Sequence, residues 1–199
     1  MSDRLTKTQK SKQKNSTSYT NLQSAISNYA LGAKGIRTVD ELKDNLSALE
    51  SRADAYIKEH AKDKPGIFNT CGKARKERIK TCARIKVMKS LLDRGIPYDS
   101  REGKMEMLAC KLMCAEKLAK GFEGFRELCQ PGAIENAMKE KLEDPSFSLR
   151  ADAVLDNAAK YDKLTKLSGA NCLEEFDKVR PDLVRDNMVN SEIRAGKTL

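Results

Sequence analysis

Residues 38–60 read TVDELKDNLSALESRADAYIKEH, and apolar or aromatic residues recur in this stretch at alternating steps of three and four. The positions of this seam are Val39, Leu42, Leu46, Leu49, Ala53, Tyr56 and His60. Such spacing is typical of an α-helix that packs lengthwise against a second helix at a shallow angle. Thr38 and Glu41 form a capping box, which predicts that the helix begins here.

Further helical patterns lie on both sides of the seam. The expected helices are one from Tyr19 to Ala33, a basic one closed at Gly95 with Ile96 packed back on Leu91, one opened by DSRE at 99–102, one at 122–128, one at 133–143, one from Ser148 to Gly169, and one opened by NCLE at 171–174. No stretch alternates apolar and polar residues as a strand would. The sequence therefore predicts an all-α protein, an irregular multi-helix bundle of about seven helices.

The composition also favours helices packed on helices. Hydrophobic residues make up 39% of the 199-residue chain, aromatic residues only 5%, and there is no tryptophan. No apolar run approaches the roughly 18 residues that a membrane span needs, and the N-terminus lacks the apolar core of a signal peptide. We therefore expect a cytoplasmic protein without membrane contact, whose six cysteines stay reduced and free.

The first residues differ from the rest of the chain. Residues 1–15 are rich in Lys, Ser, Thr and Gln and contain a single leucine, which is too little apolar surface to repay the entropy of ordering. We expect a disordered basic arm over 1–15 and a single all-α domain over 16–199.

Positive charge is concentrated in two places. The formal net charge is +9, and residues 1–14 contribute +4 of it. Residues 71–90, which read CGKARKERIKTCARIKVMKS, hold eight Lys or Arg residues against one Glu and contribute +7. The rest of the chain therefore carries −2, so the protein is a nearly neutral body with a basic arm and a basic helix.

The cations of the basic helix fall on two lines. At about 100° per residue, Lys73, Lys76, Lys80 and Arg84 share one side, and Arg75, Arg78, Lys86 and Lys89 share the other. Apolar residues are sparse in the first half of the helix and crowded in the second half. We expect the second half to anchor the helix and the first half to project toward solvent or a partner.

The beginning of this helix carries cations where the helix dipole disfavours them. A bound phosphate or carboxylate would relieve that conflict, which makes the segment a candidate anion and partner site. The candidate residues are Gly72, Lys73, Arg75, Lys76, Arg78, Lys80 and Arg84. The alternative is a solvated face that only keeps the protein soluble.

These patterns predict a non-enzymatic interaction module that contacts an acidic protein surface through its basic helix. Nucleic-acid binding stays open as an alternative. However, residues 71–97 contain no aromatic residue that could stack on exposed bases, and no zinc-finger, RRM or KH signature is present. A cysteine-dependent enzyme that pairs His60 with one of the cysteines is a third alternative. The oligomeric state is left open.

Other candidate motifs are incomplete. AGKT at 195–198 lacks the glycine that a phosphate-binding loop needs at position 191, and no helix can follow it within this sequence. Cys110 and Cys114 provide only half of a zinc site, and His60 is better explained as a packing or capping residue. We therefore expect neither a cofactor nor a metal.

YIKEH at 56–60, followed by GKARKERI at 72–79, resembles helical segments that recur in very large uncharacterised bacterial proteins. The likeness spans about a quarter of the chain. It implies no activity, and it suggests that such modules work as parts of assemblies.

Overall fold

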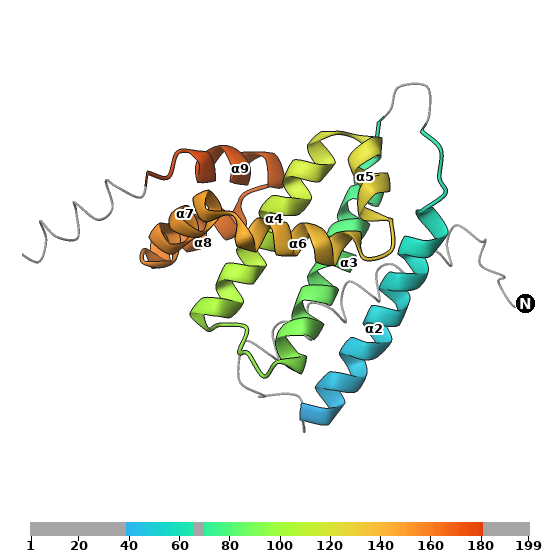
Figure 1. Ribbon diagram of the computed structural model, residues 1–199, viewed down its shortest axis with the longest axis horizontal. Helices are drawn as coiled ribbons and strands as arrows, with labels where there is room; N and C mark the ends of the chain where they lie inside the picture. Colours follow the sequence, from blue (N-terminus) through green and yellow to red (C-terminus); the bar gives the residue numbers. More distant parts are fainter. Residues whose placement is uncertain (1–38, 66–69, 181–199) are drawn as a thin grey trace, which may run out of the picture.

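The computed structural model describes residues 39–65 and 70–180, and every regular element in these ranges is an α-helix (Figure 1). The eight helices are α2 (Val39–His60), α3 (Lys73–Asp93), α4 (Arg101–Ala119), α5 (Phe122–Leu128), α6 (Ala133–Glu143), α7 (Pro145–Leu155), α8 (Ala158–Lys166) and α9 (Gly169–Asp177). The protein is therefore an all-α multi-helix bundle, as the sequence predicts.

Several expectations fall outside the described residues. These are the basic arm over 1–15, the helix from Tyr19 to Ala33, the Thr38 cap and the AGKT segment. For the same reason the boundaries of the expected 16–199 domain stay a prediction. Within the described ranges, one core cluster of buried hydrophobic side chains extends from Leu46 to Val179.

The seam predicted in residues 38–60 forms the contact between α2 and α3. Leu46, Leu49, Ala53 and Tyr56 are buried, and α2 lies alongside α3 (Figure 1). The lengthwise packing is therefore confirmed. His60 ends α2 in a half-buried position.

The helix α4 lies at the centre of the bundle and packs against α3, α5, α6, α7 and α9 (Figure 1). Helical spacing in the sequence predicts one apolar stripe on this helix, formed by Met105, Leu108, Leu112, Ala115 and Ala119. The prediction is only partly right, because Leu108, Leu112 and Ala115 are buried whereas Ala119 is exposed. Burial also extends to the other sides of α4. A helix surrounded by others has no polar face, so a stripe model describes only part of its contacts.

Two glycines allow helices to approach closely. A Cβ at Gly124 would overlap the backbone carbonyl of Lys117, so α5 can turn back tightly against α4. A Cβ at Gly103 would similarly meet the backbone carbonyls of Pro97 and Tyr98. Any side chain at these positions would push the backbones apart.

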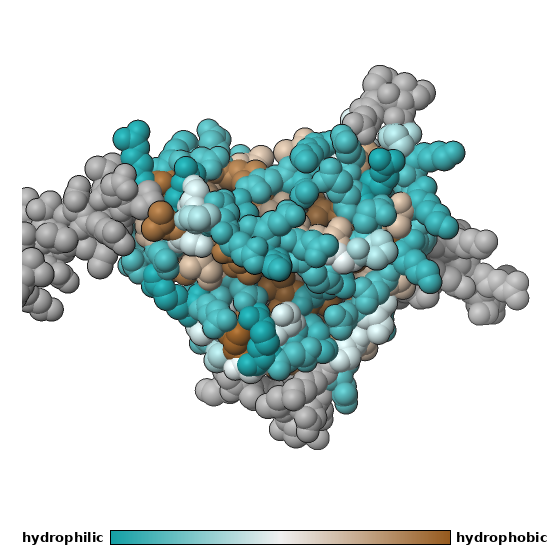
Figure 2. All heavy atoms as spheres, in the orientation of Figure 1, coloured by the Kyte–Doolittle hydropathy of each residue, from teal (hydrophilic) through white to brown (hydrophobic). Residues whose placement is uncertain are grey.

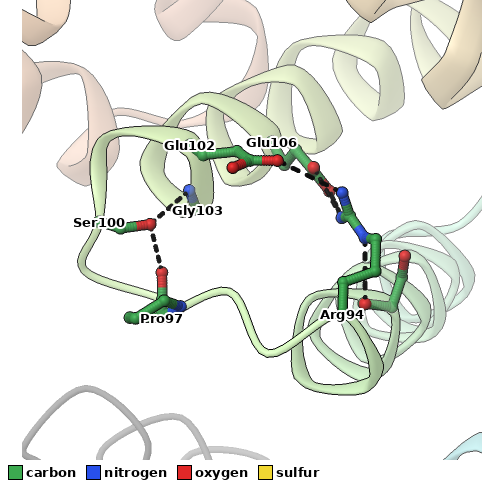
Figure 3. A network of polar contacts seen from close by, with 7 residues as sticks. Arg94, Pro97, Ser100, Glu102, Gly103 and Glu106 are labelled. Carbon is green, nitrogen blue, oxygen red and sulfur yellow. Dashed lines mark hydrogen bonds and ion pairs between the residues drawn. The ribbon is translucent and has the colours of Figure 1, made fainter.

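The connection between α3 and α4 is held by backbone and side-chain caps. Gly95 has φ +68°, its N–H donates to Leu92 O at 3.0 Å, and the N–H of Ile96 donates to Leu91 O at 2.9 Å. These two bonds are those of a Schellman cap, which confirms the predicted end of the basic helix. Ser100 then opens α4 by accepting a hydrogen bond from Gly103 N at 3.1 Å (Figure 3).

An ion pair spans the same connection. Both terminal oxygens of Glu106 accept hydrogen bonds from Arg94 Nη2 at 2.7 Å (Figure 3). Among the described residues, Glu106 is the one charged residue that is buried, and 8% of its surface is exposed. Its carboxylate is thus paired as a buried charge requires.

The predicted helix from Ser148 to Gly169 is wrong, because two helices occupy this region. The first, α7, begins three residues earlier, where the Asp144 side chain accepts a hydrogen bond from Ser146 N at 2.9 Å and Pro145 takes the first helical position. The second, α8, begins after Asn157, whose side chain accepts from Lys160 N at 3.1 Å. Local capping therefore overrides the continuous apolar spacing.

The predicted beginning of the last helix at NCLE is also wrong. The helix α9 begins at Gly169, and the backbone N–H of Cys172 already donates to Ser168 O within it. Cys172 is fully buried.

Among the described residues, no helix has the length and apolar character that crossing a bilayer requires.

Candidate binding surface on α3

The N-terminal end of α3 is open to solvent. Gly72, the N-cap, is exposed, provides no side-chain cap and has nothing described within 4 Å of the position that a Cβ would take. The first turn of α3 contains no acidic residue. The conflict between cations and the helix dipole that the sequence predicts is therefore present in the structure.

The line of cations at Arg75, Arg78, Lys86 and Lys89 forms what we call the paired row. Each of these side chains meets an acidic or aromatic partner in the described part of the chain. Most of the partners lie on other elements, so the paired row belongs to the packing of α3 against the rest of the bundle.

Arg75 and Arg78 show this packing most clearly. Arg75 Nη2 lies 3.2 Å from Asp63 Oδ2, and its guanidinium carbon lies 5.7 Å from the centre of the Phe122 ring. The guanidinium carbon of Arg78 lies 4.9 Å from the centre of the Tyr56 ring. Both geometries are those of cation–π contacts.

The other half of the paired row is held by carboxylates. Lys86 Nζ lies 2.8 Å from Asp54 Oδ1 on α2 and 2.8 Å from Glu135 Oε1 on α6. Only 14% of the Lys86 side chain is exposed. Lys89 pairs with Asp93 one turn later on α3.

The line at Lys73, Lys76, Lys80 and Arg84 forms what we call the free row. Lys80 Nζ lies 2.9 Å from Glu77 Oε1, a side chain of the same helix. Lys73, Lys76 and Arg84 form no ion pair with any acidic side chain that the structure describes. The free row therefore presents four cations and one carboxylate, and Lys73 and Arg84 are exposed.

The predicted site residues thus separate into two groups. Gly72, Lys73, Lys76, Lys80 and Arg84 lie along the free row and its N-terminal end. Arg75 and Arg78, in contrast, are engaged in packing contacts.

Sequence reasoning missed Lys111 of α4. Its Nζ donates to Leu164 O at 2.9 Å and to Thr165 O at 2.6 Å, at the end of α8. Burial lowers the pKa of Lys111, and the positive charges of Arg84 and Lys80 lower it further. The signal in the sequence is a single lysine inside the otherwise apolar run LACKLMCA of α4.

The described cysteines lie inside the protein. All six cysteines are free and buried. Burial raises the pKa of Cys82 and of Cys129 to about 12, and burial also raises the pKa of Cys71 and Cys172. These shifts disfavour the thiolate form, which is the nucleophile, at these four cysteines.

His60 lies in a packing environment. Its Nδ1 is 2.7 Å from Asp63 Oδ2, and its ring contacts Tyr56 and Phe125 edge-on. The interpretation of His60 as a packing residue therefore agrees with the structure. In residues 39–65 and 70–180, no group of three or more His, Cys, Asp or Glu side chains is arranged to hold a metal ion.

An open groove of about 590 Å³ lies between α3 and α6, with Val87, Ile134, Met138 and Leu142 among its lining residues. Brown hydrophobic residues are visible near the centre of the face drawn in Figure 2, beneath a mostly teal surface. The main cations beside the groove, Lys86, Lys89 and Arg94, are already paired with carboxylates. The groove therefore offers less unpaired charge than the free row.

No family model, curated protein or solved structure matches this chain. The resemblance to segments of large bacterial proteins stays a prediction.

Proposed function

We propose that this protein is a non-enzymatic helical interaction module that binds an acidic protein partner through the free row of α3. The observation that supports this most strongly is the contrast within one helix. The paired row is matched with partners inside the fold, whereas the free row has Glu77 as its carboxylate partner. Cations that the fold does not neutralise are available to an acidic surface.

The spacing of the free row favours a protein partner with regularly placed carboxylates. Lys73, Lys76, Lys80 and Arg84 follow one another at steps of three, four and four residues. On an α-helix they extend over about 16 Å, with one cation at each turn. Asp or Glu residues three or four apart on a partner helix repeat at the same interval. A cytoplasmic location is part of this proposal.

A titration with defined acidic probes tests the proposal. The probes are a labelled glutamate-rich helical peptide, the same peptide with glutamine in place of glutamate, and a duplex oligonucleotide. We expect the full chain to bind the glutamate peptide, to ignore the glutamine peptide, and to lose affinity as salt rises, because exposed charges are screened beyond a Debye length of about 8 Å at physiological ionic strength.

Two outcomes would contradict the proposal. Equal binding of the glutamate and glutamine peptides would show that charge does not select the partner. Tight, salt-sensitive binding of the duplex without binding of the glutamate peptide would instead favour the nucleic-acid alternative.

A further inference from the structure

We infer that Lys80, Arg84 and Lys111 form a binding site for a phosphate monoester carried by the partner protein. This inference rests on the proposed function, because it assigns a chemical group to one end of the free row. The free row alone recognises negative charge. The added lysine from α4 concentrates positive charge at one point.

The three side chains come from α3 and α4, which pack together near the beginning of α9: the position that a Cβ would take at Gly169 lies 3.2 Å from Ala115 Cβ, one turn after Lys111 on α4. Lys80 and Arg84 lie one turn apart on α3, and α3 packs against α4, which carries Lys111. Lys80 Nζ lies 3.9 Å from the position that a Cβ would take at Gly169, the first residue of α9. The helix α4 also packs against α9.

The Lys111 ammonium group is oriented by two hydrogen bonds to the backbone at the end of α8. The acceptors are the backbone carbonyls of Leu164 and Thr165, which are neutral. Burial lowers the pKa of Lys111, and the positive charges of Arg84 and Lys80 lower it further. The fold therefore fixes a third cation in the region where α3 and α4 pack, with backbone carbonyls rather than a carboxylate as its hydrogen-bond partners.

Among the described ion pairs, Lys80 of this cluster pairs with Glu77, whose Oε1 lies 2.9 Å from Lys80 Nζ. Its side chain is 61% exposed, so water screens much of its effect. Three cations against one exposed carboxylate leave an excess of two positive charges. An anion of matching charge would relieve their mutual repulsion.

A phosphate monoester fits this excess better than other anions. It carries a charge of about −1.5 to −2 on a single group at neutral pH, and its oxygens accept several charge-assisted hydrogen bonds. Arg84 offers a planar fork of donors suited to two of those oxygens. A single-stranded nucleic acid would need exposed rings on which its bases stack, and α3 has no aromatic residue.

The test compares one acidic peptide with serine or phosphoserine at its centre, measured on the full chain by fluorescence anisotropy. We expect phosphorylation to tighten binding by about tenfold or more, as new charge-assisted contacts form. Arg84→Gln and Lys80→Gln should each remove most of this gain. Lys139→Gln, which changes an exposed lysine on α6, is the matched control and should keep it.

Glu77→Gln provides a test that loss of folding cannot imitate. This change removes the carboxylate that competes for Lys80, so it should tighten binding of the phosphoserine peptide several-fold. Lys111→Gln should weaken that binding, and its melting curve reports any loss of the contact with the end of α8.

The outcomes separate this inference from the proposed function. If the serine peptide binds and phosphorylation adds nothing, or if the gain survives in the Lys80→Gln and Arg84→Gln variants, the phosphate site is wrong and the interaction module stands. If only the phosphoserine peptide binds and Arg84→Gln removes it, the site stands and recognition of carboxylates is wrong. If neither peptide binds, both are wrong.

Discussion

The two rows of α3 carry four cations each, and the fold uses them in different ways. Every side chain of the paired row meets a partner, and Asp63, Tyr56, Asp54 and Glu135 supply most of these contacts from outside α3. The free row has one described carboxylate partner, Glu77, on α3 itself. Residues that look alike in the sequence therefore differ in their contacts according to what the neighbouring elements place beside them.

The largest effect on the free energy of unfolding should come from the apolar residues that lie beneath both rows. Met88 is fully buried on α3, so Met88→Ala should lower the free energy of unfolding by about 2–5 kcal/mol, because it removes buried contacts and leaves a cavity. Chemical denaturation measures this. Ser90→Ala, at an exposed position of the same helix, is the control and should stay within about 0.5 kcal/mol. Equal effects would contradict the anchoring of α3 through its apolar half.

The next largest effect on the free energy of unfolding should come from the paired row. Replacing Arg75, Arg78, Lys86 and Lys89 together with Gln should lower the free energy of unfolding by about 2 kcal/mol, since two cation–π contacts and several partly buried ion pairs are lost. The same denaturation experiment measures it. An unchanged stability would mean that the two rows do not differ in the fold.

Cys82 provides a chemical reporter for the paired row. Burial raises the pKa of this thiol to about 12, and Arg78 and Lys86 lie close enough to influence it. In the native protein at mildly alkaline pH, Cys82 should react with a thiol reagent only when the structure opens locally. The labelling rate should rise by up to about thirtyfold in the paired-row variant, because a loss of about 2 kcal/mol of stability raises the opening equilibrium by that factor. Rapid labelling of Cys82 in the unchanged protein would contradict the burial of this face.

The sequence was sufficient to predict the fold class and several helices, but not every helix boundary and not the difference between the rows. The seam of α2, the bounds of α6 and the Schellman cap at Gly95 follow from local spacing and turn chemistry. The break at Asn157 was missed because a single side-chain cap outweighed continuous apolar spacing.

The candidate site was predictable only in part, because it depends on contacts between helices. The line formed by Lys73, Lys76, Lys80 and Arg84 follows from helical periodicity. Which line stays unpaired depends on side chains far away in the sequence, such as Glu135, and on the packing of α4, which carries Lys111, against α3. Those contacts are tertiary, and no local pattern contains them.

The smallest effect on stability should come from the free row. Replacing Lys73, Lys76, Lys80 and Arg84 with Gln should change the free energy of unfolding by less than about 0.5 kcal/mol, because the one described ion pair of this row, Lys80–Glu77, is to an exposed carboxylate. Easing the conflict with the dipole at the beginning of α3 should make the change slightly stabilising. A loss comparable to that of the paired-row variant would show that these residues also support the fold.

The central claim is that the free row binds an acidic protein partner. The most direct measurement compares the free-row and the paired-row Gln variants in their affinity for the same glutamate-rich peptide. Both variants lose four positive charges from one helix, so net charge is matched between them. The account predicts that the free-row variant keeps its melting temperature and loses binding, while the paired-row variant binds the peptide under conditions where it remains folded. Equal affinities of the two variants, at every salt concentration, would contradict it.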